Sequence, residues 1–471
     1  MVFSSLIFLF VFFPLCLLIY FITPTIKAKN YILLAFSLIF YAWGEPKLIV
    51  LMAFTSFVCY FFALVIEHYK GSAKAKYALI ATLVITLSSL ALFKYSSFFL
   101  QNVNVLFKSN MPTETFTLPL GISFYTFQAL TYVIDVYRSE TKAQRSFPNL
   151  LLYVSMFPQL VAGPIVRYSD IDKQIMDRKT TISGFSDGIT RFLIGLGKKV
   201  LLANTLGTIS RSLLDGNLTG LSVAESWVGI ICFTLQIYFD FSGYSDMAIG
   251  LGKMFGFTYL ENFNFPYISR SVSEFWKRWH MSLSSFFRDY VYIPLGGNRK
   301  HQILNLFIVW SLTGLWHGAN WNFILWGIYY FILITIEKKF LGRFLEKLPS
   351  FIGWFYSIIA IMVGWVFFYF TDLSKSMNLL KIMFFASKNA LFSDNAGQII
   401  SNNAIVICVA IIACYPIFNR LEKLYGMISI SNKAPQYAAF GLILSFNIIL
   451  LIICTASLVG SSYNPFLYFR F

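Results

Sequence analysis

A mostly apolar stretch, "SLTGLWHGANWNFILWGIYYFILI" at 311–334, contains one histidine, His317. Ionisable side chains in membrane segments are expensive to bury and usually face a cavity or a polar partner. Because desolvation disfavours a charged imidazole, we expect the His317 ring to be neutral and able to accept a proton. Such a ring suits general-base activation of a hydroxyl group. The alternative is a histidine that only forms a hydrogen bond between helices.

Asn320 and Asn322 follow this histidine in the motif "GANWN". Either side-chain amide is a candidate for orienting the imidazole, and either can instead hold two helices together. His280 lies upstream in "RWH", as a second candidate for chemistry or as a ring that reaches the headgroup region. The remaining histidines, His68 and His301, lie in basic loops and are expected to face water.

Acids also occur in the apolar stretch "QIYFDFSGYSDMAIGLGK" at 236–253. Buried acids need partners, which nearby basic residues can supply. We therefore interpret Asp240, Asp246 and Gln236 as a polar clamp between helices, with direct catalysis as the alternative.

The segment "FPQLVAGPIVRY" at 157–168 is interrupted by Pro158, Gly163 and Pro164, and Arg167 follows. Broken helices at membrane depth are tolerated where the backbone lines a cavity or packs in protein. We expect this segment to form the wall or floor of a tunnel.

The segment 269–300 is more polar than its surroundings. Ser271 or Ser273 is placed to cap a helix whose first turn contains Glu274. An apolar stripe at helical spacing follows, with basic residues at other positions. We expect one amphipathic helix, interfacial or re-entrant, on the cytoplasmic side, ending at the turn "PLGGN". The stripe consists of Phe275, Trp276, Trp279, Leu283 and Phe286.

The composition is that of an integral membrane protein. Of the 471 residues, 57% are hydrophobic and 12% are charged, whereas about a quarter are charged in a soluble domain. The apolar runs are continuous rather than alternating, which predicts helices. We expect one membrane domain, 1–471, with about a dozen spans, several of them short or polar. The spans lie near 3–23, 31–44, 48–66, 77–98, 121–137, 147–165, 187–206, 222–240, 302–317, 321–337, 352–371, 398–417 and 435–458.

Lys and Arg in short loops account for the net charge of +16. This is the positive-inside pattern of a multi-pass protein rather than a nucleic-acid surface. Basic loops at 27–29, 68–77 and 419–433 are expected inside, which predicts both termini outside. The cysteines occur singly, so neither a metal site nor a disulfide framework is indicated. No phosphate-binding glycine loop and no nucleophile elbow is present.

Six segments together resemble the membrane-bound O-acyltransferase (MBOAT) family. The resemblance is closest to the bacterial branch of alginate O-acetyltransferase membrane proteins, and extends to peptidoglycan O-acetyltransferases and teichoic acid D-alanyl transfer proteins. The segments spread over most of the chain in the expected order, whereas 340–460 matches only as generic apolar helices. They are "LPLGISFYTFQALTYVIDVYR" (118–138), "FPQLVAGPIVRY" (157–168), "QIYFDFSGYSDMAIGLG" (236–252), "EFWKRWHMSLSSFFRDYVYIPLGGN" (274–298), "LTGLWHGANWNFILWG" (312–327) and "NPFLYFRF" (464–471).

The resemblance implies an all-α polytopic fold around a central tunnel. It places the family's catalytic histidine on His317, carried by helices in 302–337, and a second signature position on His280. Both are expected to line the tunnel, into which a cytoplasmic acyl thioester enters. The further residues expected to line the tunnel or orient groups in it are Trp316, Trp279, Asn320, Asn322, Asp240 and Arg167.

The implied donor is acetyl-CoA or another acyl thioester, as a substrate, with no bound cofactor or metal. Basic residues near the inner mouth are candidates for binding the donor's phosphates. The alternative is that they are ordinary positive-inside residues. They are Arg270, Lys277, Arg278, Arg288, Arg299 and Lys300.

The C-terminal tail at 464–471 is expected outside the cell and contains Tyr468. It resembles tyrosine-containing tails of this bacterial branch. We expect Tyr468 to enter the tunnel and to carry the acyl group as a phenyl ester, since phenolate is a good leaving group. The alternative is an aromatic anchor at the membrane interface.

The resemblance therefore predicts an inner-membrane O-acyltransferase that exports acetyl groups for O-acetylation of a cell-envelope polysaccharide or exopolysaccharide such as alginate or peptidoglycan. A hydrolase-like acyltransferase outside the cytoplasm is the expected partner, since this chain shows no such domain. The alternatives are D-alanyl transfer to teichoic acid and a proton-coupled transporter. Transporters tend to show paired repeats, and no pairing is visible here.

Overall fold

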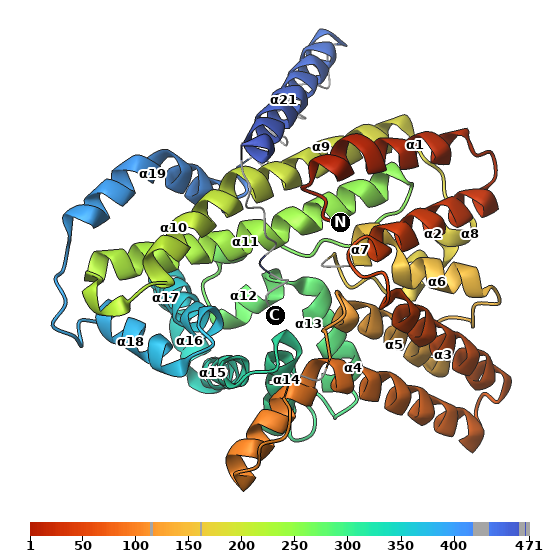
Figure 1. Cartoon of the computed structure of the whole chain (residues 1–471), viewed down its shortest axis with the longest axis horizontal. Helices are drawn as coiled ribbons and strands as arrows, with labels where there is room; N and C mark the ends of the chain where they lie inside the picture. The colour runs from red at the N-terminus through yellow and green to blue at the C-terminus, as the bar shows by residue number, and fades with distance from the viewer. Residues whose placement is uncertain (114–115, 161–162, 418–432, 461–466, 468–471) are drawn as a thin grey trace. The chain divides into compact units, whose positions relative to one another are not determined.

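The computed structural model describes residues 1–471 apart from 114–115, 161–162, 418–432, 461–466 and 468–471. In the described residues the regular elements are helices, as the apolar patterning predicts, and no strand occurs. Each apolar segment predicted from the sequence contains helix (Figure 1). The chain divides into two compact units, described separately below: unit 1 is Met1–Phe192 with Tyr244–Leu260, and unit 2 is Leu193–Gly243 with Glu261–Phe471.

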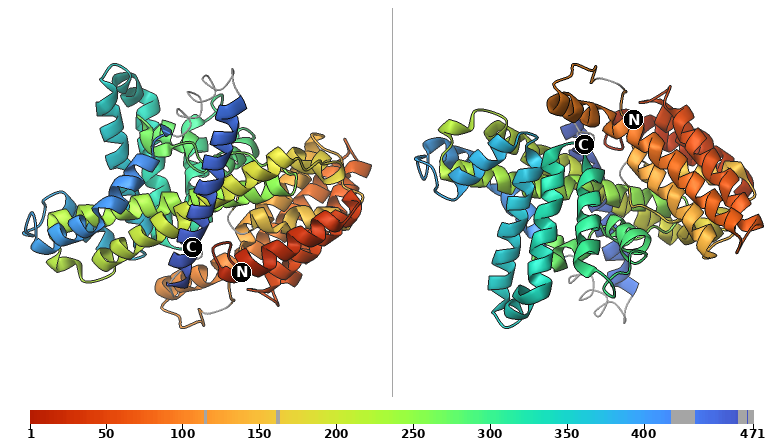
Figure 2. Two further views of the ribbon diagram at one scale, coloured as in Figure 1. Left: turned by 90° about the horizontal axis from the view of Figure 1, so that it is seen from above. Right: turned by 90° about the horizontal axis from the view of Figure 1, so that it is seen from below.

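Unit 1 contains the N-terminal helices, which are drawn in red to orange in Figure 2. Among them α3 contacts α4, α5 and α6, and α2 contacts α6, α7 and α8. Aromatic rings fill much of its interior, such as Phe8 and Phe157 with centroids 6.2 Å apart. Its helices are η1 (Phe8–Phe12), α1 (Phe13–Ile22), α2 (Ile26–Ala42), α3 (Ile49–His68), α4 (Ala73–Phe107), α5 (Ile122–Arg138), α6 (Phe147–Ser155), α7 (Phe157–Leu160) and α8 (Tyr168–Met176).

The interruption predicted at 157–168 is present in unit 1. α6 ends before it and α8 begins at its end, and the described residues between them contain one short helix, α7. Gln159 is fully buried and donates to the Tyr153 carbonyl oxygen at 2.7 Å, while the Tyr153 hydroxyl donates to the Val166 carbonyl oxygen at 2.8 Å. The described residues on either side of 161–162 are therefore buried and hydrogen-bonded within the protein, as membrane depth requires.

Unit 2 contains both candidate histidines. Two helices, α9 (Ile182–Gly197) and α11 (Val223–Met254), run through both units. Within unit 2, α14 lies beside α15, and α15 contacts α17 (Figures 1 and 2). Its other elements are η2 (Lys198–Ala203), α10 (Asn204–Leu214), η3 (Leu218–Gly220), η4 (Pro266–Ile268), α12 (Val272–Arg278), α13 (Met281–Phe287), η5 (Arg288–Tyr292), α14 (Gln302–His317), α15 (Trp321–Ile336), η6 (Glu337–Leu341), α16 (Gly342–Leu345), α17 (Ser350–Tyr369), α18 (Leu373–Met383), α19 (Asp394–Ala413) and α21 (Lys433–Val459).

Six helices of the described part of the chain are long and apolar enough to cross a membrane. Only 11% of the apolar window of one, Asp394–Ala413, is buried within the protein, and 17% of that of Phe440–Val459. Apolar helices exposed to this extent indicate a lipid environment. The others are Ile49–His68, Ala73–Phe107, Ile182–Leu214 and Ser350–Tyr369.

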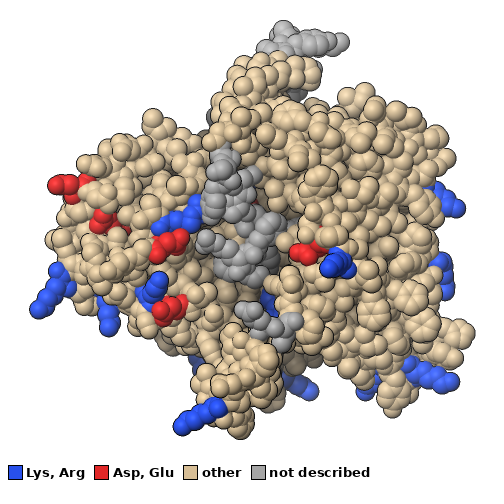
Figure 3. Space-filling view, viewed as in Figure 1, with Lys and Arg blue, Asp and Glu red and all other residues tan. Residues whose placement is uncertain are grey.

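Charged side chains are sparse on the face shown in Figure 3, as the composition predicts.

α4 has 35 residues. At 1.5 Å per residue it is about 52 Å long, more than the ~30 Å hydrocarbon core, so it tilts or extends beyond that core. Its apolar surface and length fit a multi-pass membrane protein.

Candidate active site

The hairpin of α14 and α15 carries His317, the last residue of α14. Glycines allow the two helices to approach closely: a Cβ at Gly314 would lie 2.4 Å from the Phe323 carbonyl oxygen, and one at Gly327 would lie 2.3 Å from that of Trp310. Small residues permit such contacts between helices in membranes. This close contact between α14 and α15 fixes the position of the His317 backbone at the end of α14.

Aromatic rings enclose the His317 side chain. The residue is 6% exposed, and its ring centroid lies 4.9 Å from that of Trp316, 5.0 Å from that of Trp326 and 5.2 Å from that of Phe368. These rings bury the imidazole, and aromatic faces attract cations. The carboxyl end of α14 adds partial negative charge. The surroundings therefore suit a ring that takes up a proton for a short time.

His280 lies at a break between two short helices, so the single helix predicted for this segment is wrong. α12 ends at Arg278, α13 begins at Met281, and His280 between them has a φ of 44°. This left-handed conformation is uncommon outside glycine and persists where the surroundings hold it. Here Asn264 N–H donates to the Arg278 carbonyl oxygen and Met281 N–H to that of Asn262, both at 2.9 Å. A loop that is distant in the sequence thus fixes the break, which helical periodicity cannot reveal.

The start of α12 forms as predicted, since the Ser271 side chain accepts from Glu274 N–H at 3.0 Å. Sequence reasoning missed a second cap. The buried carboxylate of Glu337, in η6, accepts from Val272 N–H at 2.7 Å and from Ser273 N–H at 2.8 Å. This carboxylate ties the helix before His280 to the end of α15.

The His280 ring is buried, with the residue 1% exposed. Its Nδ1 lies 3.1 Å from Asn262 Oδ1, and its centroid lies 4.6 Å from that of Phe241. The residue lies outside the six candidate spans. Burial lowers the pKa of His280 from 6.5 to about 3, because charging the ring would require desolvating an imidazolium. At physiological pH the ring is neutral.

Trp316 brings the two histidines into one cluster. Its ring centroid lies 5.9 Å from that of His280 and 4.9 Å from that of His317. Trp279, the other tryptophan expected at the site, is 3% exposed and packs on Trp365 with centroids 5.1 Å apart. Four predicted site residues thus share one aromatic core within unit 2.

The two asparagines after His317 are placed differently. Asn322 is fully buried and donates to the Phe367 carbonyl oxygen in α17 at 3.2 Å. This contact between helices matches the alternative considered for it. Asn320 is partly exposed and precedes α15, with no side-chain capping bond.

Asp240 is buried, and each of its carboxylate oxygens has a partner. Its Oδ1 lies 2.6 Å from Lys199 Nζ, and both side chains are at most 4% exposed. Its Oδ2 accepts from the N–H of Leu467, in the C-terminal tail, at 2.6 Å. The basic partner expected for this acid is present. The sequence predicted a basic partner without identifying Lys199. A lysine within the apolar run 187–206 is expensive to bury and therefore indicates a nearby acid.

Asp246 also has a basic partner, because Arg191 donates to its Oδ1 at 2.9 and 2.6 Å. Both residues belong to unit 1. Gln236 packs on α10, where a Cβ at Gly207 would lie 2.4 Å from Gln236 Nε2. The predicted contacts between helices are therefore present for these side chains. Arg167 lies in unit 1 and precedes α8.

The basic residues proposed for donor binding fall into two groups. Arg278 pairs with Glu274 at 2.9 Å, and Arg288 pairs with Asp289 at 2.6 Å. Arg270 and Lys277 are exposed, as are Arg299 and Lys300. Arg288 is exposed as well, with 64% of its side chain accessible, so it too can reach a ligand in solution.

Tyr468 lies outside the described residues, although its neighbour Leu467 is described.

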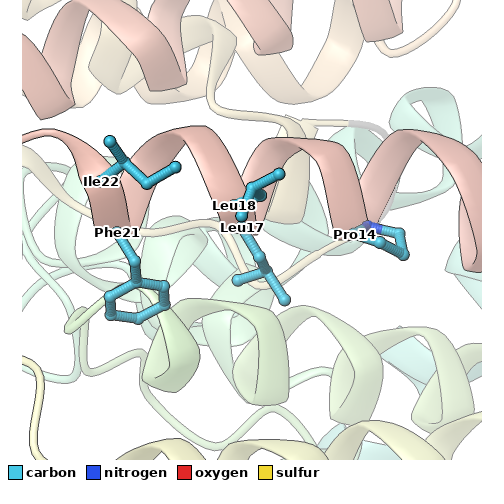
Figure 4. A pocket seen from close by; sticks show the side chains of 5 residues that line it. All are labelled: Pro14, Leu17, Leu18, Phe21 and Ile22. Carbon is cyan, nitrogen blue, oxygen red and sulfur yellow. The ribbon is translucent and has the colours of Figure 1, made fainter.

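An open apolar pocket on α1 is shown in Figure 4. No ionisable side chain lines it, so it offers no group for chemistry. Its lining residues are Pro14, Leu17, Leu18, Phe21 and Ile22.

Comparison with known proteins gives concordant matches. The profile of MBOAT, the membrane-bound O-acyltransferase family, matches residues 36–382, which include both histidines. The chain is 37% identical to "Probable alginate O-acetylase AlgI" of Azotobacter vinelandii, with 100% of both chains covered. It is 35% identical to "Peptidoglycan O-acetyltransferase" of Helicobacter pylori, over 81% of this chain and 80% of that protein. It is 31% identical to "Teichoic acid D-alanyltransferase" of Bacillus subtilis, over 47% of this chain and 59% of that protein.

Proposed function

Since this chain belongs to the membrane-bound O-acyltransferase family, we propose that it passes acetyl groups from cytoplasmic acetyl-CoA across the membrane for O-acetylation of a cell-envelope polysaccharide or exopolysaccharide. The chain is an O-acyltransferase. The acetyl group and the polysaccharide acceptor are supported by the names of the relatives similar over 80% or more of their length, an alginate O-acetylase and a peptidoglycan O-acetyltransferase.

The observation that carries the proposal is the pair of buried imidazoles in contact with Trp316. His317 accepts the proton of an attacking hydroxyl. The hydroxyl oxygen forms an ester bond with the thioester carbonyl carbon, and the carbon–sulfur bond breaks. The proton then passes to the departing sulfur, giving free CoA thiol and a neutral His317. His280 orients a substrate group, and Arg270 and Lys277 are candidates for the donor's phosphates.

The proposed membrane arrangement has about a dozen membrane helices around a tunnel that reaches both histidines from the cytoplasm. Helix in each predicted apolar segment supports this arrangement. It solves a topological problem, because acyl-CoA is cytoplasmic and the glycan lies outside. A reactive residue near the middle of the membrane transfers the acyl group while the charged carrier stays inside.

Tyr468 is the proposed relay between the tunnel and the outside. Its phenol oxygen takes the acetyl group from the thioester and releases CoA thiol. A second hydroxyl then takes the acetyl group and restores the phenol. The hydrogen bond from Leu467 N–H, one residue before Tyr468, to buried Asp240 supports this proposal, because it holds Leu467 within unit 2. The next acceptor is a hydrolase-like acyltransferase outside the cytoplasm.

Replacing Tyr468 by Phe tests the relay. Phenylalanine keeps the aromatic anchor and removes the nucleophile, so we expect acetylation of the glycan to fall to background while the protein level is unchanged. Phe469→Leu is the matched control in the same tail and should retain transfer. Unchanged acetylation in Tyr468→Phe would show that the tail is only an anchor.

Donor competition in proteoliposomes tests the function itself. Purified protein and its hydrolase-like partner would receive labelled acetyl-CoA or labelled D-alanyl carrier protein. We expect label from acetyl-CoA to reach the partner or the glycan. Transfer from the D-alanyl carrier alone would assign the chain to the D-alanylating branch, and export with no acyl donor would indicate a transporter.

A further inference from the structure

We propose that Asn262 is a positioning residue that holds His280 in the tautomer with hydrogen on Nδ1, so that Nε2 accepts a hydrogen bond from the attacking hydroxyl group. Its role in catalysis rests on the proposed function, whereas the tautomer itself does not. The proposal starts from one side-chain amide and the atoms that surround it.

The orientation of the Asn262 amide is fixed by a backbone group. Asn262 is fully buried, and its Oδ1 lies 3.2 Å from Ser282 N and 2.9 Å from Ser282 Oγ. A backbone N–H only donates, so the atom facing it must be the oxygen. If the amide were turned over, two N–H groups would face each other. The carbonyl oxygen therefore also faces His280.

This oxygen determines the His280 tautomer. Nδ1 of the ring lies 3.1 Å from Asn262 Oδ1. A carbonyl oxygen only accepts, so Nδ1 must carry the hydrogen for this contact to be a hydrogen bond. A neutral imidazole has one ring hydrogen, and Nε2 is then left with its lone pair.

His280 Nε2 is a buried acceptor that has no protein partner among the described residues. Buried polar atoms in proteins are nearly always hydrogen-bonded, so such an atom needs a specific reason. The backbone at this residue is also held in the left-handed region by Asn262, through Met281 N–H. The same asparagine thus fixes both the direction of the ring and the hydrogen on it, which is the arrangement of a preorganised site.

The tautomer restricts what His280 does in the reaction. A lone pair at Nε2 repels the negative oxygen that develops on the thioester carbonyl and the departing thiolate, so His280 does not stabilise either. It accepts from an O–H group, and the acetyl acceptor supplies one. His280 therefore orients the hydroxyl, and His317 remains the group that takes its proton.

The elements packed on His280 present mainly neutral groups to it. α11 contributes Phe241, the preceding loop contributes Phe263, and α14 contributes Trp316. The preceding loop also contains Glu261, which is exposed. Asp240 pairs with Lys199, Glu274 pairs with Arg278 on α12, and His317 lies beyond Trp316.

Nitrogen-15 NMR of the histidines tests the tautomer in the intact protein. The two neutral tautomers and the imidazolium give distinct ring shifts, and the chain has only four histidines. The signal that disappears in His280→Gln identifies the residue. We expect hydrogen on Nδ1 and no imidazolium at neutral pH. Hydrogen on Nε2 in the unmodified protein would overturn the proposal without the need for a folded variant of Asn262.

Three variants separate positioning from folding. Asn262→Leu removes the acceptor and should release the tautomer, lowering kcat for acetyl transfer about tenfold while the KM for acetyl-CoA stays unchanged. Asn262→Asp places a carboxylate at Nδ1 and should make the ring protonate at a higher pH, shifting the acidic limb of the pH–rate profile upward. Ser285→Ala is the control, because its hydroxyl donates to the Ser282 carbonyl oxygen on the same short helix. It should leave the tautomer unchanged.

An unchanged His280 tautomer and an unchanged kcat in Asn262→Leu would contradict the proposal. Failure of this proposal can be distinguished from failure of the proposed function. If His317→Ala retained transfer, the assignment of His317 would fail, but the NMR signal of His280 would still decide the role of Asn262.

Discussion

The two buried imidazoles are held in different ways, and each way suits a different task. His317 is packed by three aromatic rings at the carboxyl end of α14, surroundings that tolerate a transient cation. His280 is fixed by a hydrogen bond to Asn262 and is strongly desolvated. One ring is suited to taking a proton and the other to directing a group toward it.

The pair of Lys199 and Asp240 gives a prediction for the tail. Replacing both residues, Lys199→Met with Asp240→Leu, avoids an unpaired buried charge, and such swaps are often tolerated. The variant also removes the acceptor for Leu467 N–H. A hydrogen bond to a charged group contributes about 1.5–3 kcal/mol, so we expect about a 10- to 100-fold slower transfer to the outer acceptor. Label transfer in proteoliposomes measures it.

A second acid–base pair on α11 supplies the control for this variant. Arg191, on α9, and Asp246, on α11, form a similar contact within unit 1. Arg191→Met with Asp246→Leu should keep transfer at the wild-type rate if its folding is intact. Equal loss in both double variants would mean that the Lys199 pair acts on folding only.

Individual site residues differ in how far the sequence reveals them. His317 and Asp240 are identifiable because a polar group in an apolar run is expensive and so needs a reason. Asn262 and Glu337 lie in less apolar surroundings, where such residues are ordinary. Their partners are 18 and 64 or 65 residues away, so only the fold shows what they bind.

At the level of elements, the hairpin of α14 and α15 determines where His317 lies. Gly314 and Gly327 let the helices meet at backbone distance. The rings of Trp326 and Tyr330, on α15, have centroids 5.2 Å apart in the same core. A change in this spacing moves the imidazole relative to Trp316 and therefore relative to His280.

Gly314→Ala tests the spacing. Its Cβ would lie 2.4 Å from the Phe323 carbonyl oxygen. Overpacking of this kind destabilises by about 1–3 kcal/mol, so we expect a lower Tm in detergent and reduced transfer. Gly441→Ala is the control, since nothing lies within 4 Å of a Cβ there. A Gly314 variant with the Tm and activity of the control would show that the contact is looser than described.

The elements themselves follow closely from the sequence, because long apolar runs leave the backbone no alternative to helix. The segment 269–300 is the exception. Its stripe of apolar residues is compatible with one helix, and its cap at Ser271 is found where expected. The backbone bonds from Asn262 and Asn264 override that periodicity at His280.

For the whole molecule, composition decides the environment and loop charge decides the orientation. With six candidate spans and basic loops at 27–29, 68–77 and 419–433, we expect both termini outside the cytoplasm. Epitope tags at either end should be accessible to antibody in intact spheroplasts, with a tag in the 68–77 loop as the protected control. Protection of the C-terminal tag would place the tail on the cytoplasmic side, where Tyr468 could not pass an acetyl group to an acceptor outside.

Acetyl transfer by a His317 variant bears most directly on the central role assigned to this imidazole. Purified wild-type protein, His317→Gln and the exposed-histidine control His68→Gln would be compared with labelled acetyl-CoA in proteoliposomes. General acid–base groups contribute about 100- to 10,000-fold, so His317→Gln should lose at least a hundredfold in rate, with normal folding and His68→Gln unaffected. Transfer by folded His317→Gln within about twofold of wild type would show that the proton goes elsewhere.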